Sequence, residues 1–501
     1  MAIKHYKGEI GVFDYDDTEW EITEIGSNPY TSVFCKENHR WIGNKESLRY
    51  IGNDVKGEDI IIPIGIISCR EMFKECTSLT IAPTIPEGVI DCAGMFAGCT
   101  SLTTAPTIPE GVISCSYMFE GCTSLTKAPI ISEGIIDIIE RMCQDCPLNP
   151  GVRHYYQDCP EYQNNKCTPD LKRVLICVMR DCSYMFAGCT SLTKAPTSIP
   201  EGVENCERMF AGCTSLTKAP EEIPRAAKNC LGMFAGCTSL TKAPEEIPRA
   251  ANNCLSMFAG CTSLTTAPLI SRCHRFDVEI IGKLKFIGSR DCTGMFEGCT
   301  SLTKAPQIPE GVRDCKNMFA GCTSLTKAPT SIPEGVINCT AMFAGCTSLT
   351  TAPQIPASNS TSPQVKKCIA MFKGCTSLTK APTIPEGVEK CRAMFMGCTS
   401  LTTAPQIDST GVIDCAGMFA GCTSLTTAPT IPEGVIDCEC MFKNCISLTK
   451  APILPNNGYA NCDSIFEGCT SLESIDVAPG GNINYSHIFG DNTTICLKKH
   501  K

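Results

Sequence analysis

A repeated segment of 23 or 24 residues fills most of the 501-residue chain and constrains its fold more than any other feature. The unit reads C-x-x-M-F-x-x-C-T-S-L-T-x-A-P-x-I-P-E-G-V-x-x, as in residues 92–114. A segment this short cannot bury both of its faces alone, so stacked copies must share one continuous core. The repeat therefore predicts a solenoid. Fifteen full copies begin at Cys69, Cys92, Cys115, Cys182, Cys206, Cys230, Cys254, Cys292, Cys315, Cys339, Cys368, Cys391, Cys415, Cys438 and Cys462.

Weaker copies raise the expected number of units to about 18. Residues 139–146 and 152–159 keep part of the pattern after the Cys115 copy. A last copy follows Cys462 and has the polar residues Tyr485 and Asn492 at the two cysteine positions. Polar replacements of this kind are typical of a terminal capping repeat.

Each unit is expected to contain one short helix and one short strand. Cysteine, Met-Phe and cysteine at positions 1, 4, 5 and 8 would share one face of a helix, when the first cysteine is counted as position 1. The L-T-x-A segment predicts one strand of a parallel ladder, which the following proline ends. The I-P-E-G-V segment then predicts a turn.

The order F-x-x-C-x-x-L-x-x-A, followed by I-P-x-x-V, resembles the BspA-like, Treponema-type leucine-rich repeat. The M-F-x-G-C-T-S-L wording is similar to a related repeat group in bacterial surface proteins and some phage-encoded proteins. The resemblance covers residues 62–495. It implies a leucine-rich-repeat solenoid that binds proteins or glycans at a cell surface.

Segments that do not repeat divide the array. Insertions in a solenoid are either binding elements or tolerated surface loops, and both interpretations stay open. The predicted organisation is an N-terminal β-rich cap at 1–61, solenoid segments at 62–159, 182–271 and 292–469, an insertion at 160–181, a hairpin-like insertion at 272–291, a polar loop at 357–367, and a C-terminal capping repeat and tail at 470–501.

Composition argues against several kinds of partner and location. The net charge of −9 gives no basic surface for nucleic acid. No run of about 18 apolar residues is present, so we expect no membrane span. The first residues lack the apolar segment of a Sec signal peptide. We therefore expect the chain to be cytoplasmic as synthesised, and a cell-surface or virion location, which stays open, would require another route.

Cysteine is unusually abundant, at 39 of 501 residues. Two cysteines seven residues apart on a helix lie about 10 Å apart, which is too far for a disulfide. Equivalent cysteines of neighbouring copies would lie about 5 Å apart, where a disulfide is geometrically allowed. We favour buried thiols, because free cysteine packs as a small apolar side chain. Disulfides between copies and metal binding are the alternatives.

One local cluster has the residue types of a zinc site. It comprises Cys143, Cys146, His154, Cys159 and Cys167. A C-x-x-C pair followed by His and Cys is a moderate signal for zinc. However, Cys146 and Cys159 already occupy cysteine positions of the weak copies. We predict no metal site and no cofactor.

The sequence contains none of the G-x-x-x-x-G-K-[ST], H-E-x-x-H and G-x-S-x-G motifs. None of the six histidines recurs in the array, and no Cys-His pair stands out as a nucleophile and its base. We therefore predict a protein that is not an enzyme and has no catalytic residues.

The position after L-T, position 13, is restricted to Lys or Thr in most copies. If this column faces outward, it forms a stripe along the concave face that could hold an anionic or hydroxyl-rich ligand such as a glycan. The alternative is that the lysines only solvate the exposed sheet. The eight stripe lysines are Lys127, Lys194, Lys218, Lys242, Lys304, Lys327, Lys380 and Lys450. Candidate ligand-binding residues in the 272–291 insertion are Arg272, His274, Arg275, Lys283 and Lys285.

The sequence leaves three functions open. We favour a non-enzymatic recognition or adhesion protein that presents its concave face and loop insertions to a protein or glycan ligand. An intracellular scaffold for protein–protein interaction is the second. The third is a structural component of a phage virion or appendage, in which the length of the solenoid is the function.

Overall fold

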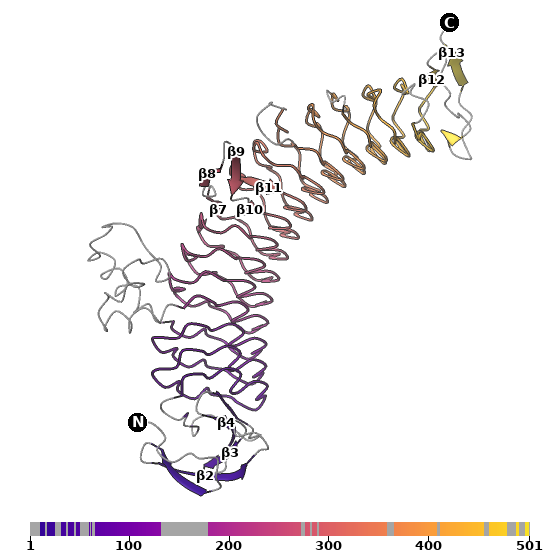
Figure 1. Ribbon diagram of the computed structural model, residues 1–501. Coiled ribbons are helices and arrows are strands. Elements are labelled where there is room, and N and C mark those ends of the chain that lie inside the picture. The colour runs from indigo at the N-terminus through magenta and orange to yellow at the C-terminus, as the bar shows by residue number, and fades with distance from the viewer. Residues whose placement is uncertain are drawn as a thin grey trace. The chain divides into compact units, whose positions relative to one another are not determined.

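The chain forms two compact units, Met1–Leu240 and Thr241–Lys501. In each unit the full copies follow one another as coils of similar shape (Figure 1). The computed structural model describes 11–15, 18–25, 32–36, 39–44, 47–50, 60, 62, 66–131, 179–271, 276–280, 283–287, 290–357, 365–407, 411–454, 460–477, 487–489 and 496–499.

Five antiparallel strands lie within residues 1–61, the segment for which the sequence predicts a β-rich cap. They form one sheet in the order β1-β2-β3-β4-β5, so each strand pairs with its neighbour in sequence. The strands are β1 (Gly11–Tyr15), β2 (Thr18–Ile25), β3 (Ser32–Lys36), β4 (His39–Asn44) and β5 (Ser47–Tyr50).

The other described strands form two-stranded pairs in the second unit. Three pairs are parallel, and the pair β8–β9 is antiparallel within the 272–291 insertion. The strands are β6 (Glu246–Ile247), β7 (Leu269–Ile270), β8 (Phe276–Ile280), β9 (Lys283–Ile287), β10 (Arg290–Asp291), β11 (Val312–Asp314), β12 (Ser474–Val477) and β13 (Cys496–Lys499).

Single parallel bridges join most of the coils. One ladder passes through position 13, as in Thr104 to Lys127, at the place where the sequence predicts a parallel strand. A second ladder passes through the residue before position 1, as in Asp91 to Ser114. Within each unit, the bridged coils are thus held to one another at two points around their circumference.

The predicted helix is wrong: positions 1 to 8 of every full copy form consecutive tight turns. In the Cys339 copy, the N–H of Cys346 donates to the carbonyl of Phe343 at 3.1 Å, across three residues. Alternate N–H groups donate to carbonyls of the next copy instead. That of Gly345 donates to Lys373 of the next copy at 2.7 Å.

Left-handed backbone at positions 3 and 7 explains the difference. The φ angles are 52° at Ala341 and 74° at Gly345, whereas an α-helix needs negative φ at every residue. The turns free alternate N–H groups to bond between copies, which a helix would use internally. Positions 1, 4, 5 and 8 are nevertheless buried, as the apolar spacing predicts.

The core of each unit consists of columns of equivalent side chains. In the Cys339 copy the cysteines, Met342, Phe343 and Leu349 are fully buried. Phenylalanine rings stack from Phe73 to Phe234 in the first unit, with centroids 5.3–5.7 Å apart. Burying one such ring contributes roughly 1.5–3 kcal/mol before entropy is subtracted.

The Cys115 copy stacks directly on the Cys182 copy. The N–H of Tyr117 donates to Ser183 at 2.8 Å, and the Phe119 and Phe186 rings are 5.7 Å apart. The prediction that the weak copies at 139–146 and 152–159 lie between them as further units is therefore wrong, and the count of about 18 falls with it. The weak copies themselves lie outside the described residues.

The 272–291 insertion also leaves the stack uninterrupted. Phe258 and Phe296 stack at 5.5 Å across it. At its base, the fully buried Arg290 donates from Nε to Ala251 O at 2.7 Å and from a terminal nitrogen to Ser271 O at 3.0 Å. These bonds satisfy the buried guanidinium and fix the point where the insertion returns to the coil.

The C-terminal copy continues the ladder over 487–489. The N–H of Phe466 donates to Ile488 at 3.0 Å, and the Ile488 side chain is fully buried. Tyr485 and Asn492, the predicted capping residues, lie outside the described residues. In the part of the chain that the structure describes, no helix has the length and apolar character needed to cross a membrane. The predicted domain boundaries remain predictions.

Candidate ligand-binding surface

The position-13 lysines lie on the outer surface of the coils, at rungs joined by parallel bridges. Lys127 bridges Lys194, which bridges Lys218, so three lysines follow one another in the first unit. In the second unit Lys304 bridges Lys327. All eight stripe lysines are exposed. We call this series of residues, including the threonines that replace Lys in other copies, the position-13 column.

Threonines at position 12 form a second exposed column beside the first. The hydroxyl of Thr103 donates to the carbonyl of Thr80 at 3.0 Å, and that of Thr326 to Thr303 at 3.1 Å. Each hydroxyl proton is thereby used inside the protein, while the oxygen keeps lone pairs that can accept hydrogen bonds. The surface thus offers lysine donors next to threonine acceptors.

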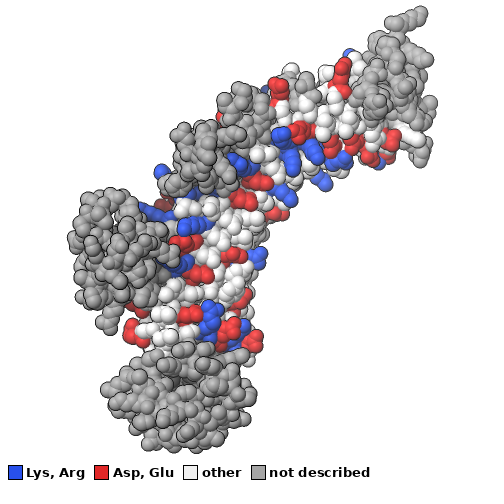
Figure 2. Space-filling model, viewed as in Figure 1, with Lys and Arg blue, Asp and Glu red and all other residues white. Residues whose placement is uncertain are grey.

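Successive lysines of the column repel one another. Neighbouring parallel strands are about 4.8 Å apart, where two unit charges in water repel by on the order of 1 kcal/mol. Lys218 is neutralised by Glu221, with Nζ and Oε1 2.8 Å apart, but exposed pairs of this kind contribute little. On the face shown in Figure 2, basic and acidic side chains are interspersed along both units. The column therefore differs from the rest of this surface in the regular spacing of its lysines and not in an excess of positive charge.

Of the five candidate residues in the 272–291 insertion, the structure describes only two. Arg272, His274 and Arg275 lie outside the described residues. Lys283 and Lys285 lie on β9, where they pair with Ile280 and Val278 of β8. Ligand binding by these five residues stays a prediction.

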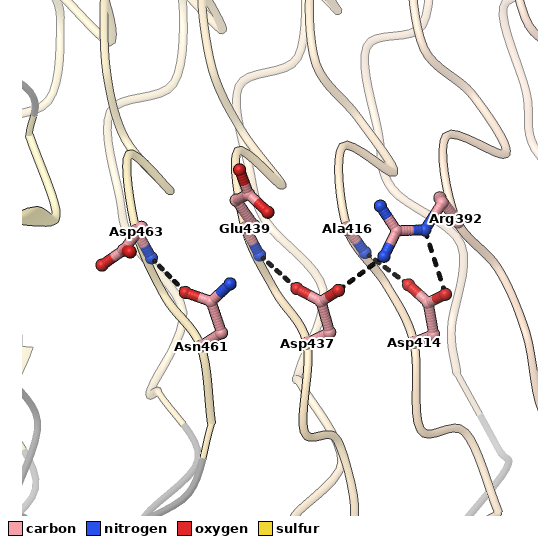
Figure 3. A network of polar contacts seen from close by, with 7 residues as sticks. All are labelled: Arg392, Asp414, Ala416, Asp437, Glu439, Asn461 and Asp463. Atoms are coloured by element: carbon pink, nitrogen blue, oxygen red, sulfur yellow. Dashed lines mark hydrogen bonds and ion pairs between the residues drawn. The ribbon is translucent and has the colours of Figure 1, made fainter.

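A polar column that sequence reasoning missed precedes position 1 (Figure 3). Asp414 Oδ1 accepts the N–H of Ala416 at 3.1 Å, and Asp437 repeats this contact one copy later. Arg392 joins the two carboxylates, at 3.1 Å to Asp414 and 2.6 Å to Asp437. Asp and Asn side chains cap turns in this way. The recurrent Asp-Cys and Asn-Cys dipeptides were the available signal.

The cysteines of the described copies form no disulfide, and all except the partly exposed Cys76 and Cys440 are buried in the core. The position-8 thiol of Cys346 donates to the carbonyl of Phe319 in the preceding copy at 3.1 Å. Burial raises the pKa of Cys368 to about 12, which keeps its thiol neutral and unsuited to nucleophilic attack or metal binding. No group of three or more metal-ligating side chains occurs among the described residues. The Cys143–Cys167 cluster lies outside them.

Comparison with known proteins agrees with the observed repeat. A model of the BspA type leucine rich repeat region, found in six copies, matches residues 31–151, 182–287, 283–402, 343–473 and 391–497. No curated protein matches the chain. A solved leucine-rich repeat protein from Bacteroides ovatus gives a TM-score of 0.51 at 19% identity, covering 94% of this chain and 98% of that chain.

A leucine rich cell surface protein from Faecalibacterium prausnitzii gives a TM-score of 0.39 at 17% identity, covering 92% of this chain and 98% of that chain. The Bacteroides likeness supports the leucine-rich-repeat fold, and the family model matches most of the sequence. The chain belongs to the BspA-type leucine-rich-repeat family.

Proposed function

We propose that this protein is a non-enzymatic recognition or adhesion protein that binds an anionic glycan through the position-13 column. The observation that carries the proposal is the exposure of all eight stripe lysines at positions held by the bridge ladder. An acidic protein segment is the alternative ligand with the same charge.

The ladder makes the column suited to an extended ligand. Backbone bridges hold the lysine Cα atoms in place before binding, so only side-chain freedom is lost when a ligand docks. Successive rungs about 4.8 Å apart offer a repeated set of contacts. Each lysine donates to an anionic group, and each position-12 threonine accepts from a hydroxyl. An anionic ligand would also remove the repulsion between Lys127, Lys194 and Lys218.

An array of anionic and neutral glycans, together with acidic peptides, tests the proposal on the full chain. A column variant replaces the eight stripe lysines with Thr, the residue that other copies use there. A control variant loses the same charge by replacing eight lysines outside the column with Thr. The control positions are Lys74, Lys228, Lys316, Lys366, Lys367, Lys373, Lys390 and Lys443.

We expect the chain to retain anionic glycans and the column variant to release them. A ligand that spans three lysines should bind roughly tenfold to a hundredfold more weakly, at about 0.5–1 kcal/mol per exposed ion pair. The control variant should bind like the original chain. Equal loss in both variants would mean that only net charge matters, and unchanged binding by the column variant would exclude the column.

A further inference from the structure

Two stacked tyrosines stand at position 3 of successive coils in the first unit. The rings of Tyr117 and Tyr184 are 4.6 Å apart and within 10° of parallel. Arg208, at position 3 of the next coil, places its guanidinium carbon 5.9 Å from the Tyr184 centroid. Tyr117 remains 41% exposed. Among the fifteen full copies, these are the only aromatic side chains at position 3.

The backbone does not favour tyrosine at this position. The φ angles are 58° at Tyr117 and 56° at Tyr184, in the left-handed region that bulky side chains rarely adopt. Most other copies place Gly, Ala or Ser there. Because the fold is built equally well by small residues, the rings call for a functional explanation.

One face of the Tyr117 ring is directed toward position 3 of the preceding coil, a rung at which glycine supplies no side chain. Tyr184 covers the other face, and the preceding coil has Gly94 at position 3. A Cβ built on Gly94 would meet Glu71 Cγ at 3.2 Å and Glu71 Oε1 at 3.9 Å. The Glu71 side chain from the coil before therefore lies over this rung, where Gly94 is buried. A ligand group can enter between Tyr117 and Glu71 only if the exposed Glu71 side chain turns aside.

Charge around the rung favours a cation. Burial and the nearby carboxylates of Glu120, Glu207 and Asp181 raise the pKa of Tyr117. Of these, Glu120 lies on the coil of Tyr117, whereas Asp181 and Glu207 belong to the coils on the Tyr184 side. On the Glu71 side, Arg70 is paired with Asp91 at 2.9 Å, which leaves Glu71 as the carboxylate next to the rung. Glu71 pairs with Lys74 at 2.8 Å, but both side chains are well exposed, so this pair is weak and can yield to another partner.

We propose that the rung between Tyr117 and Glu71 binds an arginine side chain of a basic partner protein. The guanidinium would stack on the face of Tyr117 that Tyr184 does not cover, as Arg208 does on Tyr184 at the other end of the pair, and would pair with the Glu71 carboxylate. Tyrosine and arginine are the residue types that most often dominate protein interfaces. None of the residues of this rung belongs to the lysine column, so the two proposals depend on different side chains.

The test uses the full chain and three immobilised peptides on a biosensor. The peptides are Gly-Ser-Arg-Gly-Ser-Arg-Gly and its counterparts with lysine or with citrulline, which keeps the shape of arginine without its charge. We expect the arginine peptide to bind best and the citrulline peptide worst. Tyr117→Leu and Glu71→Gln should each weaken binding of the arginine peptide, the former by about threefold to thirtyfold. Tyr117→Phe should retain binding because it keeps the ring.

Two control variants test whether binding of the arginine peptide depends on this rung alone. Glu386→Gln removes an exposed carboxylate in the second unit, and the eight-lysine column variant tests independence from the glycan proposal. Both should bind the arginine peptide like the original chain. Equal affinity for the arginine and citrulline peptides would overturn the proposal, as would full affinity in Tyr117→Leu. So would displacement of the original chain by a neutral oligosaccharide, which would make the tyrosines a sugar platform. Equal affinity for the arginine and citrulline peptides overturns the proposal without any variant. If Tyr117→Leu fails to fold, an unchanged affinity in Glu71→Gln also overturns it.

Discussion

Each buried thiol packs as an apolar side chain. This explains why the described copies contain so many cysteines and no disulfide between them. The Cys368 side chain is fully buried, and burial alone raises its pKa to about 12. In the unfolded chain a cysteine has a pKa of about 8.5. Between these two values the folded chain keeps a proton that the unfolded chain releases.

This difference predicts a loss of stability in alkaline solution. The contribution of the thiols is complete below about pH 8.5, and it is lost as pH rises from there towards 12, because the unfolded state binds fewer protons. We expect the thermal midpoint to fall steadily between pH 8.5 and 10.5, as measured by circular dichroism. Cys368→Val should reduce the slope, and Cys440→Ser, at a partly exposed thiol, should reduce it less. A midpoint independent of pH over this range would contradict the account.

The tight-turn segment, positions 1 to 8, is the element in which sequence and structure differ most. The apolar spacing correctly predicts which side chains are buried, since Met342 and Phe343 are both fully covered. It does not distinguish a helix from consecutive turns, because both place positions 1, 4, 5 and 8 on one side. The distinguishing signal was the recurrent glycine at position 7, which occupies a left-handed backbone position.

We therefore expect Gly345→Ala to be destabilising through the backbone itself. The φ angle is 74° at Gly345, and an added Cβ would meet only Gly321 backbone, at an ordinary 3.7 Å. The steric cost of a left-handed alanine is about 1–2 kcal/mol, or roughly 2–8 °C in the thermal midpoint. Glu75→Gly, at a φ of 63° in the first copy, should raise the midpoint. Equal midpoints for Gly345→Ala and the original chain would show that the turn is not the determinant.

At the scale of the whole molecule, the repeat predicted the solenoid and the exposed lysine column but not the path of the chain between distant copies. Residues that keep part of the pattern, such as 139–146, look like units in the sequence. The direct pairing of Lys127 with Lys194 shows that the full copies stack without them. Sequence pattern could not reveal this, because the same residue types can lie in the stack or outside it. The tyrosine pair was visible only as a repeated Ser-Tyr dipeptide.

Excising residues 132–178, which contain the weak copies and most of the 160–181 insertion, tests most directly the central claim that full copies alone build the stack and carry recognition. In an ordinary coil, only Pro-Glu-Gly lies between Ile108 and Val112. The equivalent residues on either side of 132–178 are Ile131 and Met179. A variant that replaces residues 132–178 with Pro-Glu-Gly should therefore keep its thermal midpoint and its retention on the anionic glycan array. A lower midpoint or aggregation would show that the excised residues are units of the stack. Loss of retention on the glycan array with an unchanged midpoint would show that residues 132–178 carry recognition.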